Sequence, residues 1–133
     1  MQKHVILTSL MAGAILLSVG CGSTTPNCNL SALSVTPTIA AADHTLAAPG
    51  DKIQFFAGPV GAKGCAAAAC VNCWGQTWTV SDPVNVSISN DAGDNGTATC
   101  LGATNGAVTV TATAPVASKS TQTVTGTATL TCN

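Results

Sequence analysis

Beyond residue 30, hydrophobic and polar residues alternate in short runs that are separated by turn residues. Alternation with a period of two is typical of β-strands that bury one side and expose the other. The pattern predicts about seven strands with no helical segment between them, and therefore an antiparallel β-sandwich. The inward-facing positions that it predicts are Leu33, Val35, Ile53, Phe55, Trp78, Val80, Val84, Val86, Ile88, Ala98, Cys100, Val108, Val110, Ala112, Val124, Ala128, Leu130 and Cys132.

Phe56 interrupts this alternation because it directly follows the apolar Phe55. A β-bulge would explain two adjacent aromatic residues in one strand, and so would a partly exposed Phe56. The pattern alone leaves both explanations open.

The N-terminal pattern is different, because Val5–Val19 is an uncharged run that follows a single lysine, Lys3. A basic start, a short apolar segment and a small residue before the cleavage point are typical of a secretory signal. The run is shorter than the roughly 20 apolar residues that span a bilayer. With Gly20 before Cys21, the segment resembles a bacterial lipoprotein signal. That resemblance implies that residues 1–20 are removed and that Cys21 becomes the lipidated N-terminus.

This interpretation divides the chain into a signal peptide (1–20), a lipidated tether (21–29) and one β-sandwich domain (30–133). The tether contains the segment Ser23-Thr-Thr-Pro26, which is typical of a short flexible linker. The membrane is the expected partner, through the lipid on Cys21. The expected location is extracytoplasmic, and Gly22 favours the outer membrane in a Gram-negative organism, as in lipoproteins generally.

The composition of residues 21–133 excludes several classes of function. This part of the chain has three lysines, five aspartates and no arginine or glutamate. It therefore lacks the basic stripe that nucleic-acid binding requires. No basic amphipathic segment indicates binding to a membrane surface. Asp43 and His44 are the one pairing that suggests acid–base chemistry, but no nucleophile motif accompanies them, and no enzymatic activity is expected.

Seven segments of the domain follow one another in a recognisable order and spacing: Leu33-Ser-Val-Thr-Pro37, Ala48-Pro-Gly50, Ile53-Gln-Phe55, Thr77-Trp-Thr-Val-Ser-Asp-Pro83, Gly96-Thr-Ala98, Gly102-Ala-Thr-Asn-Gly106 and Val108-Thr-Val-Thr-Ala112. Together they resemble the group 2 bacterial immunoglobulin-like domains over residues 32–132. The resemblance implies a seven-stranded immunoglobulin-like sandwich with Trp78 in its core. This sequence departs from the family pattern at two places, a long cysteine-rich loop at residues 58–76 and an extended segment at residues 84–95. Loops on a rigid scaffold often carry function, so the 58–76 loop with Trp74 is the expected contact surface, unless Trp74 covers a disulfide.

Six cysteines follow Cys21, and an even number in an exported chain indicates disulfides, for which 15 pairings exist. The immunoglobulin-like resemblance implies that Cys100 and Cys132 meet at one pole of the sandwich. It places Cys28 at the opposite pole, with the 58–76 loop. We therefore expect Cys28 to pair with Cys65, Cys70 or Cys73, and the remaining two to pair with each other.

Metal sites are the alternative use of these cysteines. Cys65, Cys70, Cys73 and Cys100 have the spacing of plant-type two-iron ferredoxins, and Cys70 with Cys73 forms half of a common zinc site. Export into an oxidising compartment favours disulfides over both, so no cofactor is expected. Oxygen ligands for calcium occur at Asp91, Asp94 and Asn95, although these are also ordinary turn residues.

The expected function is therefore a non-enzymatic, structural or adhesive role for a lipid-anchored module of the cell envelope, with a surface protein as its partner. A glycan- or ligand-binding accessory module is the alternative. A metal or redox protein that uses Cys65, Cys70 and Cys73 is a further one.

Overall fold

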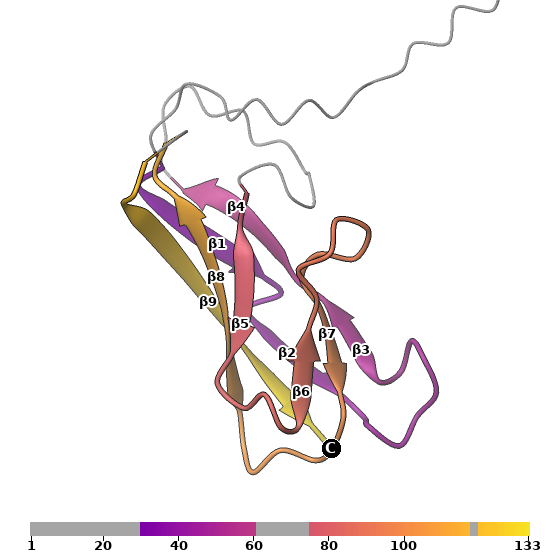
Figure 1. Cartoon of the computed structure of the whole chain (residues 1–133). Coiled ribbons are helices and arrows are strands. Elements are labelled where there is room, and N and C mark those ends of the chain that lie inside the picture. The colour runs from indigo at the N-terminus through magenta and orange to yellow at the C-terminus, as the bar shows by residue number, and fades with distance from the viewer. Residues whose placement is uncertain (1–29, 61–74, 118–119) are drawn as a thin grey trace, which may run out of the picture.

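A computed structural model of the chain describes residues 30–60, 75–117 and 120–133. These residues form nine β-strands and no helix (Figure 1). The all-β prediction is therefore confirmed. The strands are β1 (Ala32–Thr36), β2 (Ile39–Ala42), β3 (Lys52–Gln54), β4 (Phe56–Val60), β5 (Thr77–Val80), β6 (Val86–Ile88), β7 (Thr97–Cys100), β8 (Val108–Pro115) and β9 (Thr123–Cys132).

One layer of the sandwich is a four-stranded sheet in the order β2-β9-β8-β5. Its centre is the long antiparallel pair of β8 and β9, in which Val108 lies opposite Leu130 and Pro115 lies opposite Thr123. β5 continues the sheet antiparallel to β8, whereas β2 runs parallel to β9 at the other edge.

The second layer consists of the pair β1-β4 and the sheet β3-β7-β6. β3 and β4 follow each other directly in the chain, with only Phe55 between them. When β3 and β4 are counted as one interrupted strand, this layer has four strands. Their order is β1, then the combined β3 and β4, then β7, then β6. This order, opposite a β9-β8-β5 sheet, is that of the immunoglobulin-like sandwich.

With β3 and β4 counted as one, seven of the strands correspond to six of the predicted runs and to the shortened run at β6, whereas β2 (Ile39–Ala42) lies in a segment for which no strand was predicted. The predicted first strand ends at Pro37, which has no N–H to continue a β-ladder, and the chain then crosses to the other layer, where β2 pairs with β9. The predicted second strand is divided at Phe55. Its N–H donates to the carbonyl of Gly96 (2.9 Å), next to the β3–β7 pairing, whereas from Phe56 onward the strand pairs with β1. Phe55 is fully buried and Phe56 is 47% exposed. The structure therefore shows both an interrupted strand and a partly exposed Phe56.

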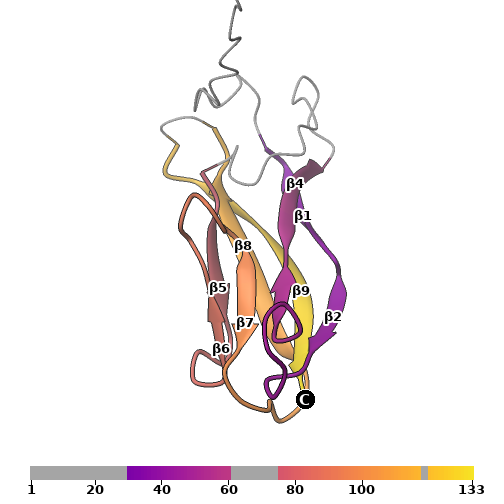
Figure 2. The ribbon, with the colours of Figure 1, turned by 90° about the vertical axis from the view of Figure 1, so that its right-hand side faces the viewer.

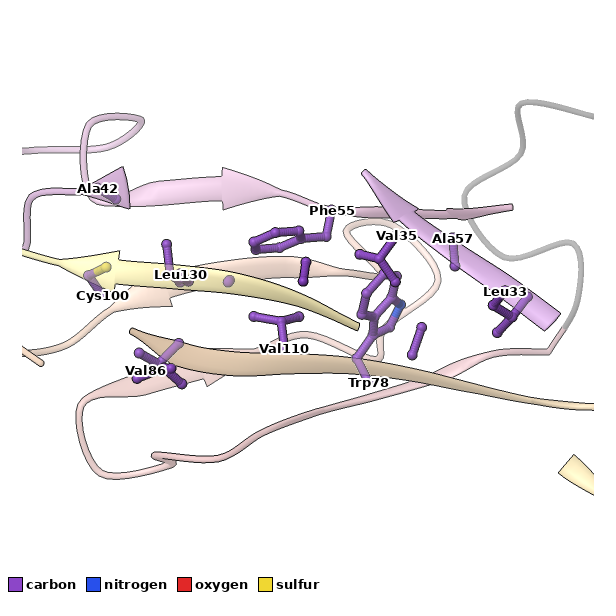
Figure 3. Close-up of a cluster of buried hydrophobic side chains, with 14 of the residues drawn as sticks. Leu33, Val35, Ala42, Phe55, Ala57, Trp78, Val86, Cys100, Val110 and Leu130 are labelled. Atoms are coloured by element: carbon purple, nitrogen blue, oxygen red, sulfur yellow. The ribbon is translucent and has the colours of Figure 1, made fainter. Parts of the chain in front are cut away.

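The core lies between the two layers and contains nearly all of the inward positions predicted from the alternation. Trp78 is 2% exposed, and its ring lies 6.4 Å from that of Phe55, centroid to centroid. Figure 3 shows these two side chains packed among Val35, Val110 and Leu130. In β8 and β9 every second residue faces the core along the whole strand, as the alternation predicts.

The prediction that Val84 faces inward is wrong. Val84 is 78% exposed, and β6 begins two residues later at Val86. The side chain of Asp82 explains this difference, because its Oδ1 accepts hydrogen bonds from the backbone N–H groups of Val84 and Asn85 (both 3.2 Å). These bonds hold residues 82–85 in a turn, and a turn does not maintain the alternation of a strand.

Cys100 and Cys132 form a disulfide between the ends of β7 and β9, with their Cα atoms 5.7 Å apart. This pairing agrees with the expectation. It links the two layers, because β7 and β9 belong to different sheets. Because Cys132 is the last residue of β9, the disulfide lies at the end of the sandwich where the C-terminus is marked (Figures 1 and 2). We call this end the disulfide pole.

Candidate interaction surfaces

Most of the residues to which the sequence assigned a site lie outside the described residues. Only the Cys100–Cys132 pair can be compared with the structure. The predicted lipidation site, the other disulfide cysteines and the predicted contact residue therefore stay predictions. These residues are Cys21, Cys28, Cys65, Cys70, Cys73 and Trp74.

The described residues do show at which end the chain enters the domain. The backbone N–H of Leu30 donates to the carbonyl of Val116 (2.7 Å), and Ser31 Oγ donates to the carbonyl of Val60 (2.6 Å). The start of the domain thus lies beside the end of β4 and the residues after β8. This entry pole is opposite the disulfide pole (Figures 1 and 2).

The residues considered as calcium ligands form an ordinary turn in the structure. Asp94 Oδ1 accepts a hydrogen bond from Ser89 Oγ (2.6 Å), and the carbonyl of Asp94 accepts one from the N–H of Thr97 (2.8 Å). Asn95 is 1% exposed and turns its side chain into the core. Within the part of the chain that the structure describes, no group of three His, Cys, Asp or Glu side chains could hold a metal ion.

Asp43 and His44 also have structural contacts. Asp43 Oδ1 accepts hydrogen bonds from the Oγ1 (2.7 Å) and N–H (2.9 Å) of Thr45, which lower the pKa of this carboxyl group. The backbone N–H of His44 donates to the carbonyl of Asn133 (3.2 Å), and its ring Nδ1 contacts the same oxygen. These bonds attach the turn after β2 to the end of β9.

The most extensive regular surface is the outer side of the β2-β9-β8-β5 sheet. We call it the threonine face. Along β5, β8 and β9, threonine occupies every second position and points away from the buried residues between. The ten threonines of this face are Thr77, Thr79, Thr109, Thr111, Thr113, Thr123, Thr125, Thr127, Thr129 and Thr131.

The strand register aligns these threonines in rows. Thr111 lies opposite Thr79 on one side and Thr127 on the other, and Thr113 lies between Thr77 and Thr125 in the same way. Strand geometry separates neighbours by about 4.8 Å across the sheet and about 6.7 Å along it. The four strands of this sheet contain no charged residue. The face therefore presents a neutral array of hydroxyl and methyl groups.

The sequence interpretation did not identify this face, although its signal was present. Threonine at alternate positions over 109–113 and 123–131 is visible in the sequence. Alternation identifies the buried side of each strand, and the threonines occupy the opposite side. Only the register shows that the threonines of three strands form common rows.

Three of the six exposed large apolar residues among those described lie near the disulfide pole, whereas Ile39, 79% exposed on β2, pairs with Thr129 at the edge of the threonine face. The N–H of Leu101 donates to the carbonyl of Asn85 (2.7 Å), which places exposed Leu101 next to the turn that carries exposed Val84. Leu46, also exposed, lies in the loop between β2 and β3. Phe56 is the exposed member of the three described aromatic residues and lies on the second layer, away from the threonine face.

In the part of the chain described, no helix has the length and apolar character to cross a membrane. Comparison with known proteins adds no family assignment. No protein-family model matches the chain, and no curated protein matches it.

Proposed function

We propose that this protein is a lipid-anchored, non-enzymatic immunoglobulin-like module of a bacterial cell envelope, with a structural or adhesive role. The observation that supports it most directly is the separation of the two poles. The chain enters the sandwich at Leu30 and Ser31, at the end opposite the Cys100–Cys132 bond. A lipid on Cys21 would then hold the entry pole near the membrane and present the disulfide pole outward.

The contacts of the polar side chains support a non-enzymatic role. Asp43, Asp82 and Asp94 each accept hydrogen bonds that hold a turn, and Asn95 binds the buried indole of Trp78. These groups stabilise the scaffold and do not converge on a common site. The sandwich is thus suited to present its faces and loops.

The anchoring part of the proposal is tested by expressing the full chain and a Cys21→Ser variant in a bacterial host. The wild-type protein should sediment with membranes, require detergent for release and carry acyl groups on Cys21 in its mass spectrum. The variant should lose all three properties. Equal membrane retention of both proteins, or residues 1–20 retained in the wild type, would refute a lipid anchor.

A second candidate, a glycan-binding accessory module, is favoured by the threonine face. Rows of neutral hydroxyl and methyl groups can approach a neutral, hydroxyl-rich polymer without burying an unpaired charge. In Thr111→Lys, an ammonium group would stand at the centre of the row Thr79, Thr111, Thr127. The matched control is Ser87→Lys, which puts the same charge on the exposed side of β6 in the other layer.

Co-sedimentation with insoluble polysaccharides distinguishes the two functions. If the threonine face binds glycan, Thr111→Lys should weaken sedimentation at least tenfold and Ser87→Lys should leave it unchanged. If the Trp74 loop binds instead, Trp74→Ala should be the variant that loses binding. Lack of sedimentation by the wild type over the whole panel would leave the structural or adhesive role as the proposal.

The remaining alternative, a metal or redox protein, is tested by the mass of the mature chain without reduction. Disulfides among all six cysteines after Cys21 remove two hydrogens for each bond. Free thiols at Cys65, Cys70 and Cys73 together with bound iron or zinc would overturn the proposal.

A further inference from the structure

The chain contains two Asn-Gly pairs, Asn95-Gly96 and Asn105-Gly106, and the structure places them in opposite environments. An asparagine that precedes a glycine can deamidate spontaneously, without an enzyme. The backbone nitrogen of the glycine attacks the side-chain Cγ, a C–N bond forms, and the Cγ–Nδ2 bond breaks. The nitrogen's proton leaves with Nδ2 as ammonia. Water then opens the resulting succinimide to aspartate or isoaspartate.

This reaction has structural requirements. The asparagine side chain must be free to rotate toward the next residue, the glycine N–H must be free of a strong hydrogen bond, and water must reach the ring. The glycine helps because no side chain blocks the approach to its nitrogen and its backbone is conformationally permissive. Folded structure can therefore suppress the reaction at one pair and allow it at another.

At Asn95-Gly96 the structure opposes every requirement. Asn95 is 1% exposed, and its Oδ1 accepts a hydrogen bond from the indole Nε1–H of Trp78 (2.8 Å). The N–H of Gly96 donates to the carbonyl of Ser89 (2.8 Å). The nucleophilic nitrogen and the reacting side chain are thus both held, and the site is closed to water.

At Asn105-Gly106 the requirements are met. Both residues are exposed, in the loop between β7 and β8. A Cβ placed on Gly106 would meet no atom within 4 Å. Among the described residues, the Asn105 side chain and the Gly106 N–H have no hydrogen-bond partner, while Thr104 fixes the loop by donating from Oγ1 to the carbonyl of Gly106 (2.8 Å).

We propose that Asn105 is a site of spontaneous deamidation and isomerisation in the folded protein, and that Asn95 is protected. The product carries a new carboxylate near the disulfide pole, since Thr104 N–H donates to the carbonyl of Cys132 (2.9 Å). Residues 21–133 contain three lysines and five aspartates, which give a formal net charge of only −2, so one added negative charge is a large relative change. Where isoaspartate forms, the backbone of the loop also becomes one carbon longer.

The test is to incubate the purified mature protein in mildly alkaline buffer and to map both pairs by peptide mass spectrometry over time. Enzymatic methylation of isoaspartate identifies the isomerised product. Deamidation replaces the side-chain NH₂ by OH and so raises the mass of the peptide. This mass increase should appear at least ten times faster in the Asn105 peptide than in the Asn95 peptide. Asn105→Gln should abolish the fast reaction, and Asn95→Gln should leave it unchanged.

Protein unfolded in urea, with its disulfides reduced, is the control for intrinsic reactivity. There the two pairs should react at similar rates, which would show that the fold causes the difference. The proposal is overturned if Asn105 stays intact in the folded protein while it reacts in the unfolded one. It is equally overturned if the folded protein modifies Asn95 as fast as Asn105.

Discussion

The indole Nε1–H of Trp78 donates a hydrogen bond to Oδ1 of Asn95 across the interior of the sandwich (2.8 Å). Trp78 belongs to β5 in one layer, and Asn95 precedes β7 in the other. Gln54 Nε2 donates to the carbonyl of the same asparagine (2.9 Å). The loop between β6 and β7 is therefore fixed to both layers by polar contacts.

Replacement of Asn95 by alanine removes the acceptor of the Trp78 indole. A buried donor without a partner costs about 1–3 kcal/mol, and we expect Asn95→Ala to lower the free energy of unfolding by that amount. Urea denaturation followed by tryptophan fluorescence measures it through the midpoint. Asn105→Ala, in an exposed loop, should change stability by less than about 0.5 kcal/mol. Equal effects of the two variants would show that the bond does not stabilise the fold.

Three glycines provide a graded test of backbone strain. Gly96 has φ +82°, and an added Cβ would lie 2.5 Å from the carbonyl oxygen of Phe55. Gly106 has φ +90° in open space, and Gly93 has neither constraint. Alanine should therefore be nearly neutral at Gly93, cost about 1–2 kcal/mol at Gly106 and cost more at Gly96. Urea midpoints in any other order would contradict this explanation.

The disulfide should contribute substantially to stability. Closing the loop from Cys100 to Cys132, whose ends are 32 positions apart, should stabilise by about 3–4 kcal/mol on the chain-entropy estimate. We expect the double variant Cys100→Ala/Cys132→Ala to fold with a reduced urea midpoint. A reducing agent should then lower the midpoint of the wild type more than that of the variant. An equal shift in both would assign the effect of the reducing agent to other cysteines.

Asn90 protects an edge of the first layer. Its Oδ1 accepts a hydrogen bond from the N–H of Trp78 (2.6 Å), and its Nδ2 donates to the carbonyl of Trp78 (3.1 Å). These are backbone groups of β5, the last strand of its sheet. Exposed strand edges promote association, so Asn90→Ala should increase dimers or aggregates in light scattering. Ser87→Ala, which changes a side chain on the outer face, should remain monodisperse like the wild type.

The carboxyl group of Asp82 gives the stability a pH dependence. The hydrogen bond from Asn85 Nδ2 (2.8 Å), with those from the backbone of Val84 and Asn85, lowers the pKa of Asp82 below its ordinary value of 3.8. A pKa that is lower in the folded state stabilises the protein above about pH 4, and this contribution is lost as the pH falls through the folded-state pKa. Asp82→Asn should reduce the fall in urea midpoint between pH 7 and pH 3, and an unchanged fall would contradict the assignment.

The sequence by itself determined which side of most strands is buried. Alternation with a period of two is a local property, and the buried residues of β8 and β9 follow it throughout. It also determined that Cys100 and Cys132 both face inward, which their disulfide requires. The position of Trp78 in the core was predictable for the same reason.

The tertiary structure decided what depends on partners distant in the chain. The change of layer after Pro37 and the interruption at Phe55 depend on which strands offer hydrogen bonds there. Asn95 looked like a surface turn residue, and only the approach of Trp78 from the other layer made it the acceptor of a buried indole. The rows of the threonine face likewise arise from the register of β5, β8 and β9. Alternation records which side of a strand avoids water, whereas register and hydrogen-bond partners are set by long-range pairing.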